Sequence, residues 1–179
     1  MDYRFAGLVA VLIGIGPTLH AQSIENRRLV WEDFKGTPDA ASPYDAYTYW
    51  SVRYTFDPPQ RTATGLRIRF HVSNRLGERS WVKRGTPRES QLAELLNHEQ
   101  GHYSLGVICA LEFKKAAEAF SFTSNYRAEA SRLFGETLDQ VLKLEKAYDA
   151  ETRHMYDRAQ QKAWDAKLAR RIEELWEYR

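Results

Sequence analysis

The pattern of apolar residues changes near residue 86, and this change restricts the folds available to the chain. Before it, aromatic and β-branched residues gather in short runs at 47–56 and 66–72, the second with strict apolar and polar alternation. A period of two is typical of a half-buried strand, here with His71 on the polar face. After it, the longer segments predict helices. Strands followed by helices predict an α+β domain, with a small antiparallel sheet packed on a helical second half.

Three helices are expected in the second half of the chain. Thr86 can serve as an N-cap, with Pro87 at the first helical position and Glu89 reaching back from the third. The helix that starts there is predicted to run to about residue 120. A second helix is expected from about 125 to 146, and a third, densely charged one from 150 to 176.

The N-terminal 21 residues have the layout of a secretory signal peptide. An apolar run from Phe5 to Ile15 is followed by Gly16 and Pro17, and Ala21 offers a small residue for cleavage. A buried N-terminal helix is the alternative. We therefore expect an exported protein, periplasmic or secreted, with a signal peptide at 1–21 and a single domain at 22–179. No stable membrane anchor is expected after cleavage.

Charge and cysteine content narrow the classes of partner and fold. The chain has 26 Lys and Arg against 24 Asp and Glu, which gives no electrostatic reason to expect nucleic acid as a partner. Cys109 is the single cysteine, so no internal disulfide can form. It falls within a helical pattern, where a small buried residue is expected.

The segment 98–102, His-Glu-Gln-Gly-His, carries the strongest chemical signal. His98 and His102 are four residues apart on a predicted helix, so both imidazoles lie on one face and can bind one metal ion. Glu99 projects beside them and is placed to accept a proton from a water that the metal activates. This is the H-E-x-x-H arrangement of zinc peptidases, although a five-residue match can also arise by chance.

A catalytic zinc site usually has three protein ligands and one open position. Outside the pair, the predicted mature chain has His71 and His154. His154 is expected at the start of the last helix, where Glu151 shares its face and is the alternative third ligand. His71 could instead line a cleft and stabilise an oxyanion, although a solvated position on the strand is the simpler interpretation.

Two other classes of function stay open at this stage. Zinc could hold helices together in a non-catalytic envelope protein, in which case four protein ligands would close the site. The aromatic first half could also form a face that binds peptide or glycan, although core and sheet packing explains these residues more simply. The residues of that aromatic group are Tyr44, Tyr47, Tyr49, Trp50, Tyr54 and Phe56.

Four blocks of sequence resemble a bacterial family, the domain of unknown function 922 family, whose members are described as secreted zinc-dependent proteases. The blocks are 29–36 (Leu-Val-Trp-Glu-Asp-Phe-Lys-Gly) with Ala46-Tyr47-Thr48 soon after, 80–83 (Ser-Trp-Val-Lys), 95–102 (Leu-Leu-Asn-His-Glu-Gln-Gly-His) and 148–154 (Tyr-Asp-Ala-Glu-Thr-Arg-His). They occur in the family order and span nearly all of the predicted mature chain.

The resemblance implies a zincin-like peptidase in which His98 and His102 bind Zn²⁺ and Glu99 is the catalytic base. It favours the block 148–154 as the region that supplies the third ligand, for which we expect His154, with Glu151 as the alternative. Tyr148 and Asp149 of the same block are then expected to support the ligands or an oxyanion. Met155 stands where the family pattern leads us to expect Gly. The expected activity is zinc-dependent hydrolysis of amide bonds in a peptide or protein substrate.

Overall fold

The computed structural model describes residues 23–63, 65–85 and 88–179. The predicted signal peptide, and the predicted cap at Thr86 and Pro87, lie outside these residues. The chain is an α+β protein, as its sequence predicts. None of the helices in the described ranges is both long enough and apolar enough to cross a membrane.

Short antiparallel strands form the first half of the described chain. β2 (Trp50–Phe56) pairs with β5 (Phe70–Leu76) along its whole length, in the register Tyr54 opposite Val72. β1 (Ala46–Tyr47) pairs with β6 (Trp81–Val82), and β3 (Gln60–Thr62) pairs with β4 (Gly65–Arg67). The strands predicted at 47–56 and 66–72 are therefore present, but each is interrupted once.

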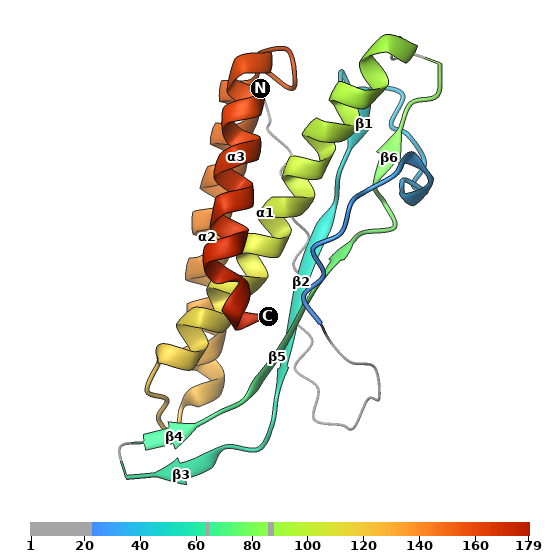
Figure 1. The fold of residues 1–179 in the computed structure, drawn as a ribbon. Coiled ribbons are helices and arrows are strands. Elements are labelled where there is room, and N and C mark those ends of the chain that lie inside the picture. The colour runs from blue at the N-terminus through green and yellow to red at the C-terminus, as the bar shows by residue number, and fades with distance from the viewer. Residues whose placement is uncertain (1–22, 64, 86–87) are drawn as a thin grey trace.

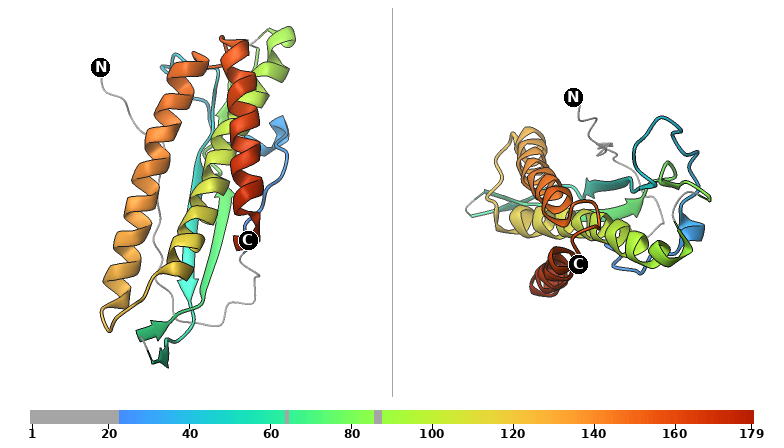
Figure 2. Two further views of the ribbon diagram at one scale, coloured as in Figure 1. Left: turned by 60° about the vertical axis from the view of Figure 1, so that its left-hand side comes forward. Right: turned by 90° about the horizontal axis from the view of Figure 1, so that it is seen from above.

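Three helices follow the strands. A short 3₁₀ turn (Glu89–Gln91) leads into α1 (Leu92–Ala119), and α2 (Tyr126–Thr152) and α3 (Arg158–Leu175) complete the second half. α1 is the central element, because it packs against both long strands and against both other helices. Seen from above, the strands and α3 lie on different sides of α1 (Figure 2).

The predicted boundary between the second and third helices is wrong. α2 continues to Thr152, six residues beyond its predicted end, and α3 begins only at Arg158. Between them, Arg153, His154 and Met155 have φ values of 50°, 52° and 77°. Because a right-handed helix cannot pass through left-handed residues, His154 lies in a turn and not on the last helix.

The core lies where β2, β5, α1 and α2 meet. Tyr54 contacts the rings of Phe70, Phe113 and Phe134, one from each neighbouring element. Cys109 is fully buried on α1, as predicted, and burial raises the pKa of its thiol to about 12. A large apolar core of this kind fixes α1 against both the strands and α2, which matters for the residues that α1 carries.

Candidate metal site

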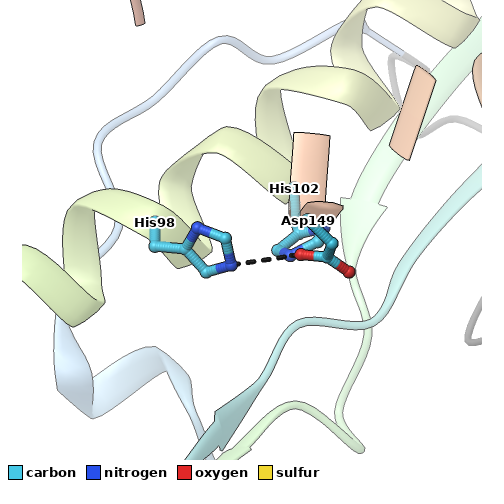
Figure 3. A group of neighbouring side chains, drawn as sticks. All are labelled: His98, His102 and Asp149. Carbon is cyan, nitrogen blue, oxygen red and sulfur yellow. Dashed lines mark ion pairs between the residues drawn. The ribbon is translucent and has the colours of Figure 1, made fainter. Parts of the chain in front are cut away.

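The two histidines of the H-E-x-x-H segment point from α1 towards one carboxylate on α2 (Figure 3). The Nε2 atoms of His98 and His102 lie 3.2 Å and 3.1 Å from the same atom, Oδ1 of Asp149. The donor atoms of these three residues all lie within 4.8 Å of one another. The structure therefore brings together the predicted helical pair and a carboxylate that the sequence analysis had placed in a supporting role.

A small residue inside α1 allows α2 to approach this closely. A Cβ atom at Gly101 would lie 2.2 Å from the hydroxyl oxygen of Tyr148, which is fully buried. The Tyr148 ring stacks on the imidazole of His98, with centroids 4.8 Å apart. The phenol donates a hydrogen bond to the carbonyl oxygen of His98 at 2.9 Å. Gly101 thus admits the tyrosine that fixes the first histidine.

The other ring nitrogen of His98 is held by an amide from α3. The Nε2 group of Gln161 donates to the Tyr148 oxygen and to the Asp165 carboxylate, so its Oε1 atom faces Nδ1 of His98 at 3.1 Å. Because this oxygen can only accept, Nδ1 of His98 must carry the hydrogen. In the neutral ring, Nε2 then presents a lone pair towards Asp149.

A carboxylate from α2 fixes His102 in the same tautomer. Oε1 of Glu145 accepts from the indole Nε1 of Trp50 at 3.0 Å and lies 3.1 Å from Nδ1 of His102. Such a hydrogen bond from the outer ring nitrogen is the usual support of a metal-binding histidine. The Nε2 atoms of both rings therefore face Oδ1 of Asp149.

Burial alone lowers the pKa of His102, but the Asp149 and Glu145 carboxylates outweigh it and raise that pKa well above its usual value, so the cluster favours a positive charge among its three inner atoms. Oδ1 of Asp149 is buried, and none of its nitrogen neighbours meets hydrogen-bond geometry. Burial alone raises the pKa of the Asp149 carboxyl, but the imidazoles of His102, His154 and His98 outweigh it and leave that pKa well below its usual range. Lone pairs and a carboxylate at this separation repel one another unless a proton or a metal ion lies between them.

The distances also suit a metal ion. Four ligand atoms about 2.0–2.1 Å from a tetrahedral zinc ion lie about 3.3 Å from one another. The separations of 3.1 Å and 3.2 Å from the Asp149 oxygen to the two Nε2 atoms are close to that edge length. Two imidazoles and one carboxylate are also donors that zinc accepts. The residues present therefore fit a zinc ion.

Glu99 is buried beside the pair without joining it. Its Oε2 atom accepts a hydrogen bond of 2.6 Å from the hydroxyl of Thr48, which lies between β1 and β2. The close group of metal-binding donors in the described residues does not include Glu99. Glu99 is therefore adjacent to the histidine pair but bonded to the strand side of the site, and its predicted role as a base stays a prediction.

The three other residues predicted for the site, His154, Glu151 and His71, lie at different distances from it. His154 is close to the site, with its Nδ1 atom 3.4 Å from Oδ1 of Asp149. Glu151 instead accepts a hydrogen bond from the indole of Trp164 at 2.7 Å, on the α3 side. His71 pairs with Asp57 at 2.8 Å on the β2–β5 hairpin. The part of β5 that carries it lies towards the β3–β4 end, away from the α2–α3 turn (Figure 1).

The sequence analysis did not anticipate the residues that support the site. Gln161, Glu145 and Thr48 come from three different segments, and no spacing links any of them to the histidine pair. One available signal was the interval of four between Glu145 and Asp149, which puts both carboxylates on one helical face. Gln100 has a further role, because its amide bonds the backbone of Leu29 and Arg27 and ties the N-terminal segment to α1.

The fold and the site define an α+β protein in which a helical histidine pair meets a carboxylate from a second helix. Residues 26–155 match the family described as "Bacterial protein of unknown function (DUF922)", and the chain belongs to this family. The resemblance seen in the sequence is thereby confirmed, while the description assigns no activity. No curated protein and no solved structure matches the chain.

Proposed function

We propose that this protein is an exported zinc-dependent hydrolase of amide bonds, and that its substrate is a peptide or protein. The observation that carries the proposal is the convergence of His98 Nε2, His102 Nε2 and Asp149 Oδ1 within 4.8 Å of one another. These three atoms would hold the zinc ion. Asp149 replaces His154 and Glu151 as our choice of third ligand, because its oxygen is the atom that both imidazoles face.

Zinc bound there would polarise a carbonyl group and lower the pKa of a water molecule to about 7. Glu99 would act as general base, taking a proton from that water and passing it to the leaving amine. Because the Thr48 hydroxyl donates to Oε2 of Glu99, we propose that Oε1 is the atom that takes the proton from the water. In this proposal α1 acts as a zincin-like active-site helix, and the buried hydrogen bonds of His98 and His102 keep its ligands in place.

The side chains of the site are more exposed on the α2–α3 side than on the α1 side. The side chains of His98 and His102 are only 4% and 12% exposed, whereas those of Asp149 and His154 are 32% and 43% exposed. We propose that a substrate approaches along the α2–α3 turn, where these side chains are the more exposed ones. A zinc site that only joins helices would have four fixed protein ligands and no such access.

Metal analysis of the purified protein tests the ligand set. Wild type is expected to hold close to one zinc per chain, and His98→Ala and Asp149→Ala are expected to hold almost none. His71→Ala is the matched control, because that imidazole pairs with Asp57 on the hairpin. Equal and near-zero zinc in the wild type and all variants would remove the proposal.

Turnover tests the role of Glu99 separately from metal binding. With a fluorescently labelled unfolded protein as substrate, Glu99→Gln should keep its zinc and lose activity by about a hundredfold or more. Glu118→Gln, an exposed glutamate on the same helix, should keep both. If wild type binds zinc but cleaves nothing while the site resists added ligands, a structural zinc site would be the better assignment.

A further inference from the structure

His154 occupies an unusual place beside the proposed metal site. Its Nδ1 atom lies 3.4 Å from Oδ1 of Asp149, and its ring lies 6.2 Å from that of His98. Yet the close group of donors in the described residues contains His98, His102 and Asp149 without it. The imidazole of His154 therefore lies next to the three proposed ligands but outside their close group.

The supports of His154 differ from those of the other two histidines. His98 and His102 are fixed through their outer ring nitrogens by buried partners on α3 and α2. The His154 side chain is 43% exposed, and its ring contacts that of Tyr44 at 4.8 Å, a residue that is itself exposed. A ring held at the surface in this way can rotate at little cost, whereas the two buried rings cannot.

The backbone beneath this half-exposed ring is, by contrast, held by several contacts. The His154 amide donates to the carbonyl oxygen of Asp149 at 3.1 Å. The next side chain, Met155, is buried against Ala46 and Leu95. Three successive residues without a glycine stay in the left-handed region, which happens only where the surroundings hold them there. The turn thus holds the His154 backbone in a position from which Nδ1 of its ring lies 3.4 Å from Oδ1 of Asp149.

We propose that His154 is a displaceable fourth ligand of the metal. In the resting protein its Nδ1 atom would complete the coordination, and the water that the proposed hydrolysis uses, or a small anion, would take its place. This inference rests on the proposed function, since it assumes a metal held by His98, His102 and Asp149. The metal would then have four protein ligands at rest, as a structural site has, and three protein ligands with one exchangeable position during the reaction, as a catalytic site has.

Cobalt substitution tests this directly, because the visible absorption of Co²⁺ reports its coordination and does not depend on turnover. His154→Asn is the variant to use, since asparagine tolerates a left-handed backbone better than alanine does. Its Co²⁺ spectrum should differ from that of wild type. Azide should bind it about tenfold more tightly, because the coordination position no longer has to be vacated first. His71→Asn should match wild type in both.

Two results would overturn the proposal in different ways. Identical spectra and identical azide affinity in wild type and His154→Asn would show that His154 never coordinates. Loss of Co²⁺ as complete as in His98→Ala would show a permanent ligand. Failure of wild type to bind any metal would remove the proposed function together with this inference.

A measurement on the wild type alone guards against misfolding of the variant. With ¹⁵N-labelled histidine, the Nδ1 resonance of His154 should shift when zinc is added and return when azide is added. The Nε2 resonances of His98 and His102 should shift with zinc and stay shifted. A His154 signal that ignores zinc would overturn the proposal.

Discussion

The site draws on two regions that are built in opposite ways. The middle of α1 is regular and largely buried, and partners on α3 and α2 fix the tautomers of His98 and His102. The α2–α3 turn is irregular and half-exposed, and it carries His154 through three residues in an unfavourable backbone conformation. The difference separates two structural roles: a regular helix holds two buried imidazoles in place, and a constrained turn presents a third imidazole that is half-exposed.

The close contact between Gly101 and Tyr148 gives the largest expected effect on stability. Gly101→Ala would push a methyl group into a buried ring that cannot retreat, so it should destabilise the protein by about 3 kcal/mol. Gly135→Ala is the matched control, since nothing lies within 4 Å of its added Cβ. It should stabilise α2 by about 0.5–1 kcal/mol. Urea unfolding with a chelator present measures both, and equal effects would contradict the rigid-helix description.

The hydroxyl group of Tyr148 gives an intermediate effect. Tyr148→Phe would leave the carbonyl oxygen of His98 and the amide of Gln161 without their buried partner, at a cost of about 1–2 kcal/mol in the free energy of unfolding. Zinc affinity should fall by about tenfold, because both groups orient the first ligand. The exposed Tyr156→Phe should change neither quantity. Unchanged zinc affinity in Tyr148→Phe would show that the phenol only stabilises the fold.

Replacing a residue by glycine should stabilise the protein in the α2–α3 turn, whereas it should destabilise the protein within a helix. Arg153 is exposed and has a φ of 50°, so Arg153→Gly should remove backbone strain and stabilise the protein by about 0.5 kcal/mol. Arg170→Gly, at an exposed position within α3, should destabilise it by about 1 kcal/mol. Thermal unfolding of both variants checks the contrast in sign. A destabilised Arg153→Gly would mean that the turn is not strained at this position.

The sequence predicted the regular region well and the irregular region poorly. The period of two in the first half and the helical spacing of His98 and His102 are local properties, and the structure has both the strands and the helix. The turn at Arg153–Met155 contains no glycine, the residue that usually marks a left-handed turn, so the third helix was predicted to include His154. The only sign of an irregular backbone there was Met155, which stands where the family pattern has glycine.

By itself, the sequence determined that two imidazoles share one helical face, that a glutamate lies beside them, and that strands precede helices. These follow from residue spacing, because the periods of helix and strand are fixed by the backbone. Only the tertiary structure decided that Asp149 meets the pair, that Gln161 and Glu145 set its tautomers, and that Glu151 turns to Trp164. Those contacts depend on where the chain reverses and on how tightly α2 packs against Gly101, and no short stretch of sequence encodes either.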